Sequence, residues 1–209
     1  MKHIALIAAC TFLASAVALA ASGEKLIVPP YPGDPAWKNI TNKGNAEQQL
    51  LEWIPASQSE ADIHDILTEQ IFFAAKGADP ATFVTNFLNG AAQACDHVRV
   101  NGPKRNSENG YPVAYAQVYC AHQKGTSLDV DIFLKAIAGR DALYVVQREF
   151  RHPMQPGAVP GVIDVPKGQE AAMNARLALQ VAADRFLTAG VQLCPPPGKG
   201  AACPAKPKP

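Results

Sequence analysis

The chain has 209 residues, of which 48% are hydrophobic and 18% charged, and its formal net charge is +1. This length suits a single domain with one real core. A nearly neutral chain lacks the basic surface that nucleic acids require, so no nucleic-acid partner is expected. It also contains no internal repeat, and no apolar stretch beyond the N-terminal one is long enough to span a bilayer.

The N-terminus has the pattern of a secretory signal peptide over Met1–Ala20. A positive start is followed by the apolar run Ile4–Leu19, which ends in a small-x-small site. This pattern predicts cleavage after Ala20 and a periplasmic or secreted protein. An alternative is a lipoprotein anchored at Cys10, because Ile7-Ala8-Ala9-Cys10 loosely resembles a lipobox.

Four cysteines remain after the signal peptide is removed, and an even number in an exported protein favours two disulfides. Three pairings are open. We favour Cys95 with Cys120 and Cys194 with Cys203, because the second pair closes a short local loop.

After the signal peptide, residues 21–47 are rich in Pro, Gly and Asn in their middle and predict an extended segment. A single domain is predicted over 48–193. Its first helix is expected at Glu60–Ala75, where Ile63, Ile66, Leu67 and Ile71 follow helical spacing. Its second is expected at Pro80–Cys95, since Asp79-Pro80 is a typical helix start.

The stretch Tyr111–Arg151 predicts an antiparallel β-meander, because its three strand-like runs are joined by links too short for parallel crossovers. From Ser127 to Ala136, apolar residues alternate with Asp129, Asp131 and Lys135. Alternation of this kind is typical of a strand with one buried face and one wet face. The residues before the meander, Asn101–Gly110, read as a polar loop.

The third helix is predicted at Gln169–Thr188, with Met173, Leu177, Val181 and Phe186 as its inner stripe. A Pro-rich loop precedes it, and a flexible Pro/Lys-rich tail is predicted over 194–209. The fold class is therefore α+β. An antiparallel sheet of four to six strands, with the meander at its centre, carries about three helices mainly on one face.

Two phrases resemble an uncharacterised family of exported proteobacterial proteins: Glu52-Trp53-Ile54-Pro55, continuing to Thr68-Glu69-Gln70, and the strand Tyr144–Arg151. The pattern is similar to the α+β sandwich of PsbP- and Mog1-like proteins. That resemblance implies an antiparallel sheet flanked by helices, and members that mostly bind partners. It brings no catalytic residues.

A zinc site is one chemical interpretation of Cys95, His97, Cys120 and His122. Two Cys-x-His units supply the thiolates and imidazoles of a tetrahedral site. In an oxidising compartment the two cysteines more often form a disulfide, which we favour. Accordingly no cofactor is expected.

A carboxylate-dependent hydrolase, or a calcium site, is a second interpretation, carried by Asp129 and Asp131. Solubilising charge on a wet sheet face is the simpler explanation of both residues. The chain contains no Gly-x-Ser-x-Gly and no Gly-rich phosphate loop, so neither a serine hydrolase nor a nucleotide site is predicted.

Polar side chains gather at the end of the last meander strand, at Gln147, Arg148, Arg151 and His152. They suggest a surface for a partner or small ligand, although a salt-bridged strand end explains them as well. The sequence therefore favours an exported, non-catalytic periplasmic accessory or binding module stabilised by disulfides. Its partner is expected to be another envelope protein or a small ligand.

Overall fold

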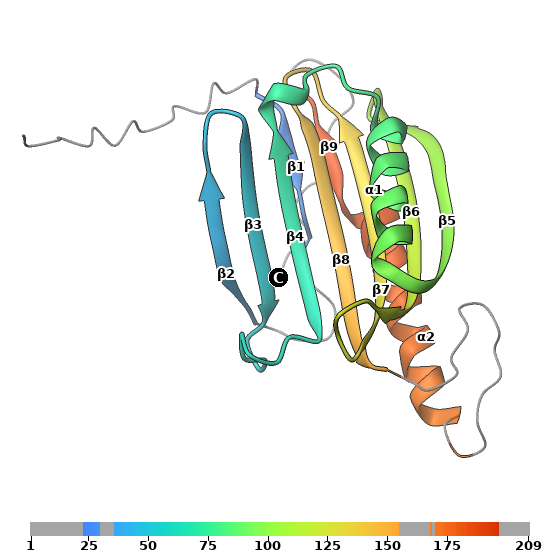
Figure 1. Ribbon diagram of the computed structural model, residues 1–209. Coiled ribbons are helices and arrows are strands. Elements are labelled where there is room, and N and C mark those ends of the chain that lie inside the picture. Colours follow the sequence, from blue (N-terminus) through green and yellow to red (C-terminus); the bar gives the residue numbers. More distant parts are fainter. Residues whose placement is uncertain (1–22, 30–35, 155–167, 169, 197–209) are drawn as a thin grey trace, which may run out of the picture.

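The computed structural model describes residues 23–29, 36–154, 168 and 170–196. Its centre is a seven-stranded antiparallel sheet with the order β2-β3-β4-β8-β7-β6-β5 (Figure 1). The strands are β2 (Trp37–Gly44), β3 (Gln48–Pro55), β4 (Asp65–Phe72), β5 (Cys95–Glu108), β6 (Tyr111–Gln123), β7 (Leu128–Ala138) and β8 (Leu143–Pro153). A second, two-stranded sheet pairs β1 (Lys25–Ile27) with β9 (Gln192–Cys194).

The meander β6-β7-β8 lies where the sequence predicts it, but β5 extends it by one strand. The polar run expected to be a loop pairs with β6 as far as Glu108 opposite Tyr111, interrupted by a register shift between Asn101 and Lys104. Backbone pairing with an established neighbour therefore overrides the weak strand propensity of these residues.

The predicted helix Glu60–Ala75 is wrong. Half of this stretch is β4, which is followed by a single 3-10 turn at Phe73–Ala75. β4 pairs with β3 on one side and β8 on the other, so it is an interior strand of the sheet. Ile66 and Leu67 point to opposite faces and are both buried. Adjacent apolar residues of this kind mimic helical spacing.

Two α-helices pack on the large sheet, one on each face, whereas about three were predicted mainly on one face (Figure 1). Helix α1 (Pro80–Ala94) begins at Asp79, whose carboxylate accepts hydrogen bonds from the Ala81 and Thr82 amides. It packs on β5, β6 and β7. Helix α2 (Glu170–Arg185) continues into a π-helical turn, η2 (Phe186–Gly190), and lies against β7 from the other side.

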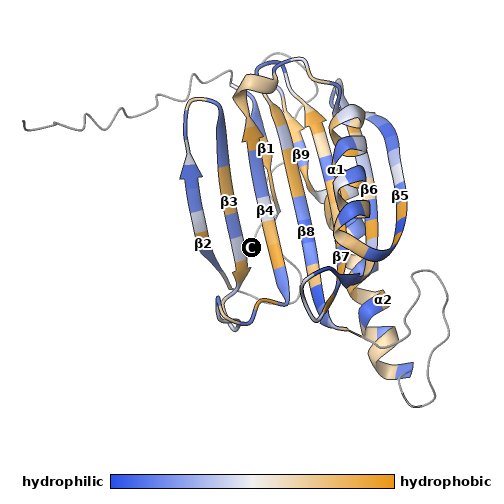
Figure 2. Ribbon diagram, in the orientation of Figure 1, coloured by the Kyte–Doolittle hydropathy of each residue, from blue (hydrophilic) through white to orange (hydrophobic). Residues whose placement is uncertain are grey.

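Because both faces are covered, two apolar clusters form. On the α1 side of the sheet, Val84 and Leu88 meet Leu134. On the α2 side, Leu187 belongs to one cluster with Phe133. Strand β7 contributes alternate residues to the two clusters, so the face predicted to be wet lies in the interior. The hydropathy pattern of Figure 2 shows the mixed polar and apolar character of these strands.

A disulfide joins Cys95, at the junction of α1 and β5, to Cys120 in β6. This disulfide ties helix α1 to the sheet that the helix covers. Cys194 is disulfide-bonded as well, and its predicted partner Cys203 lies outside the described residues. The predicted signal peptide and the lipobox cysteine Cys10 also lie outside them. Within the described residues, no helix has the length and apolar character of a membrane span.

Candidate functional site

The residues predicted to form one polar surface lie on two faces of the sheet. On β8, Gln147 is opposite Leu134 and shares the α1 side, whereas Arg148 is opposite Phe133 and shares the α2 side. Side chains alternate along a strand, so Arg151 lies with Gln147. Asp129, Asp131, Arg148 and His152 lie together on the α2 side.

Asp131 is buried rather than solvated. It is 0% exposed and receives hydrogen bonds from Arg176 at 2.6 and 2.7 Å and from Gln180 at 2.9 Å. His152 Nε2 lies 3.3 Å from its carboxylate. Burial alone raises the pKa of Asp131, but the contact with His152 and the hydrogen bonds from Arg176 and Gln180 outweigh it and lower the pKa to about 2. This carboxylate is a structural anion that holds α2 on the sheet.

Asp129 is also buried, at 2% exposed, and accepts a hydrogen bond of 2.9 Å from the His122 backbone amide. The two carboxylates considered for a hydrolase or a calcium site are therefore both in the interior, which corrects the expectation of a wet face. A reacting carboxylate has to reach its substrate, and neither side chain is accessible to one.

The cysteine and histidine units do not come together as zinc ligands. Both sulfurs of Cys95 and Cys120 are used in the disulfide. His97 is exposed on β5, and His122 contacts Asp96 through Nδ1. Among the described residues, no three His, Cys, Asp or Glu side chains are grouped to hold a metal ion.

Two cations that the sequence places on exposed surfaces, Lys135 on the wet face of its strand and Arg148 in the partner surface, are buried instead. Lys135 is 0% exposed, and its ammonium donates to Glu108 at 2.6 Å and to the Leu187 carbonyl oxygen at 3.0 Å. Burial lowers its pKa, and the ion pair with Glu108 opposes that effect. Arg148 donates to both carboxylate oxygens of Asp65. Isolated charges within apolar strands are the only sequence signal for these pairs, and such charges also occur on exposed strands.

The α1 side of the sheet is only half covered. Helix α1 lies over β5, β6 and β7, and no described helix lies over the part formed by β3, β4 and β8 (Figure 1). We call this part the open sheet face. The strand registers place these side chains on it: Gln48, Leu50, Glu52, Ile66, Thr68, Gln70, Gln147, Glu149 and Arg151. Ile66 and Thr68 are buried, and the others are partly or fully exposed.

Three side chains of the open sheet face form an ordered group. Glu149 accepts a hydrogen bond of 2.7 Å from Arg151 Nε and one of 3.3 Å from Gln147 Nε2. The arrangement orients Gln147 and Arg151, two of the residues that the sequence singles out. Both are partly exposed. This group therefore presents an amide and two charged side chains in fixed positions, which suits recognition of a polar surface.

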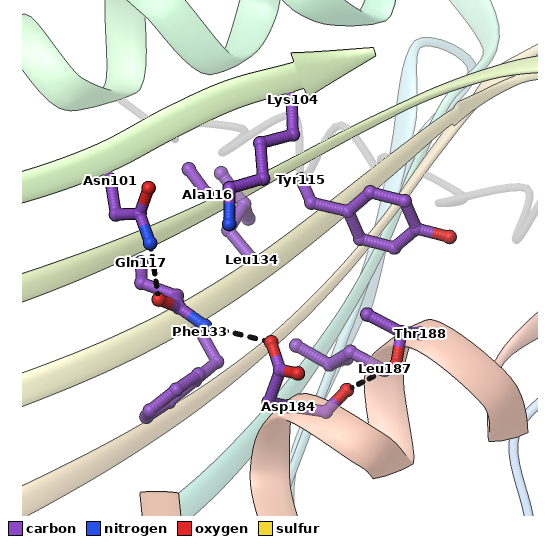
Figure 3. A pocket seen from close by; sticks show the side chains of 10 residues that line it. All are labelled: Asn101, Lys104, Tyr115, Ala116, Gln117, Phe133, Leu134, Asp184, Leu187 and Thr188. Carbon is purple, nitrogen blue, oxygen red and sulfur yellow. Dashed lines mark hydrogen bonds between the residues drawn. The ribbon is translucent and has the colours of Figure 1, made fainter. Parts of the chain in front are cut away.

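A small pocket lies on the α2 side, between β5, β6 and the end of α2 (Figure 3). Its volume is ≈ 130 Å³. Gln117 links its walls, accepting from Asn101 Nδ2 and donating to Asp184. Pockets for small organic ligands are usually about 300–1,000 Å³, so this one is too small to hold such a ligand.

Comparison with known proteins gives two loosely similar solved structures. The Saccharomyces cerevisiae Ran-binding protein Mog1p is 11% identical, covers 81% of this chain and 94% of its own, and has a TM-score of 0.43. LpqN, described as involved in cell envelope biogenesis of Mycobacterium tuberculosis, is 13% identical, covers 82% and 92%, and has a TM-score of 0.36. At these TM-scores the likeness supports no inference about activity or partners. No family model matches the chain, and the search of curated proteins finds no significant match.

Proposed function

We propose that the protein is an exported, non-catalytic accessory module that binds another envelope protein through the open sheet face. The observation that carries this proposal is the uneven cover of the α1 side. One half lies under a helix, and the other half presents ordered polar groups around Glu149. Gln147 and Arg151 are contact residues in this proposal.

Export is supported by the disulfide and by the predicted signal peptide. Disulfides persist in oxidising compartments such as the periplasm and are rare in the cytosol. The bond between Cys95 and Cys120 anchors the helix that leaves the open sheet face bare. The disulfide and the predicted signal peptide both support a function outside the cytosol.

A binding role is favoured over a hydrolase because Asp129 and Asp131 are engaged inside the protein. A protein partner is favoured because the open sheet face spans three neighbouring strands and carries several polar side chains. Protein interfaces typically combine a large area with many polar contacts, which this face offers.

Photo-crosslinking in intact cells tests the proposal. The photoreactive residue p-benzoylphenylalanine would replace Gln70, which lies on the open sheet face between β3 and β8. We expect one discrete cross-linked product with an envelope protein. Changing Gln147→Arg in the same chain should greatly reduce the product, because it replaces the amide with a cation beside Glu149, where it competes with Arg151 for that carboxylate.

The matched control places the photoreactive residue at Asn86, which is exposed on α1. The proposal predicts no such product there. It is wrong if Gln70 and Asn86 give the same products, or if neither gives any. Separately, a cytosolic protein with reduced Cys95 and Cys120 would contradict the export part.

A further inference from the structure

Helix α2 turns its apolar stripe toward solvent. Leu177 is 41% exposed and Val181 is 60% exposed, although the sequence predicts both as part of an inner stripe. The only fully buried residue of α2 is Ala183. An amphipathic helix normally buries its apolar stripe, so this orientation leaves an apolar surface without a described partner.

The rotation of α2 is held by polar contacts. Arg176 makes two hydrogen bonds to Asp131, and Gln180 makes a third. Residues four apart share one face of a helix, so these two side chains face the sheet together. Leu177 and Val181 follow each of them by one residue and are therefore turned away from the sheet centre.

The exposed stripe is complementary to itself. Steps of three or four residues place Glu170, Asn174, Leu177, Val181 and Arg185 along one side of α2, over about 22 Å at 1.5 Å per residue. All five are exposed. Glu170 lies in the first turn and Arg185 in the last turn, and Leu177 and Val181 lie between them.

Two such helices fit together when they run antiparallel. A two-fold axis crossing the helix between Leu177 and Ala178 sets Glu170 opposite Arg185 of a second copy, at both ends. It also brings the Leu177 side chains of the two copies together at the centre. The surface is thus of the isologous kind, in which the same patch serves both subunits, as in most homodimers.

From this self-complementarity we propose that a second copy of the chain covers the stripe, forming a two-fold dimer through α2. The proposal is independent of the proposed function, because α2 and the open sheet face lie on opposite sides of the sheet. The dimer leaves both open sheet faces free, so the assembly is bivalent.

Sedimentation velocity on the oxidised, full exported chain over a wide concentration range tests the dimer. We expect a reversible monomer–dimer equilibrium. Leu177→Glu should raise the dissociation constant by at least roughly tenfold, which corresponds to about 1.4 kcal/mol. The control is Leu179→Glu, because Leu179 is also 41% exposed but points to the other flank of α2, and it should leave the constant unchanged.

Charge reversal tests the antiparallel register. Glu170→Arg and Arg185→Glu should each weaken the dimer, because each opposes like charges across the axis. The double variant restores opposite charges and should return the dissociation constant toward that of the wild type. Circular dichroism of each variant separates loss of association from loss of folding.

Three outcomes overturn the proposal. The first is a chain that stays monomeric up to its solubility limit. The second is a dimer that Leu177→Glu and Leu179→Glu affect equally. The third is a double charge variant whose dimer has a dissociation constant as high as those of the two single variants. Photo-crosslinks at Gln70 do not bear on any of these results, so the two proposals fail separately.

Discussion

The two helices of this protein use the sheet in opposite ways. Helix α1 buries an apolar stripe, with Val84 at 0% and Leu88 at 6% exposure, in an apolar cluster. Helix α2 instead turns the partly exposed Arg176 and Gln180 toward the buried Asp131, and its apolar residues Leu177 and Val181 face solvent. One helix is held mainly by apolar burial, and much of the other by a buried ion pair.

The difference shows what sets the orientation of a helix when the strand beneath it has an apolar face and a charged face. On the α1 side, β7 presents Leu134 and its apolar neighbours. On the α2 side it presents Asp131, Phe133 and Lys135, so a helix there has to satisfy buried charges. Unpaired buried charge costs more than an exposed leucine, and the polar residues of α2 therefore face inward.

The largest predicted effect comes from breaking the ion pair under α2. Asp131→Ala leaves the partly exposed Arg176 guanidinium without its partner; breaking a buried pair typically costs about 3–5 kcal/mol, and the 22% exposure of Arg176 places the expected loss near the lower end. Urea unfolding at one fixed protein concentration measures it, because any dimer makes stability depend on concentration.

The double variant Asp131→Ala with Arg176→Leu serves as the control for this prediction. It removes both charges and should lose clearly less stability than the two single changes together. If Asp131→Ala changes stability by less than about 1 kcal/mol, the ion pair does not hold α2.

A second prediction compares the loss of stability when one leucine of each helix is truncated to alanine. Leu88→Ala in α1 removes a buried side chain and should cost about 2–5 kcal/mol. Leu179→Ala in α2 removes one that is 41% exposed and should change stability by less than about 0.5 kcal/mol. Equal losses in urea unfolding would show that α2 buries its apolar residues after all.

The smallest effect is a dependence on acid. In the folded protein the pKa of Asp131 is lowered from 3.8 to about 2 by hydrogen bonds that outweigh its burial. A carboxyl group whose pKa is lower in the folded state stabilises the fold at any pH above its pKa in the unfolded chain. This contribution, about 2 kcal/mol, is lost as the pH falls from about 4 to about 2. Asp131→Asn should unfold with a shallower dependence on pH across this window. Parallel curves for the two proteins would contradict the assignment.

Local signals were enough to predict helix α1 and the meander. Asp79-Pro80 and an apolar stripe define α1, and short turns force β6, β7 and β8 to run antiparallel. The alternation in β7 also assigned Asp131 and Lys135 correctly to one face. Each of these features depends on residues close together in the chain.

Local signals failed where another layer decides the environment. The run from Ile63 to Ile71 has helical spacing, yet β4 is a strand because β3 and β8 pair with it on both sides. The polar surface predicted on β8 was divided between two faces for a similar reason. Gln147 and Arg151 lie on the open sheet face, and Arg148 lies in the interior with Asp65.

The sequence alone determined the class of fold, the strand-forming centre and the face on which each β7 residue lies, because these follow from spacing along one chain. Only the tertiary structure decided that α2 covers the charged face. That choice buries Asp131 and Lys135, sets the rotation of α2 and exposes Leu177 and Val181. Burial is a property of what packs on a surface, and the residues that pack on β7 are about forty to fifty positions away from it, at Arg176, Gln180 and Leu187.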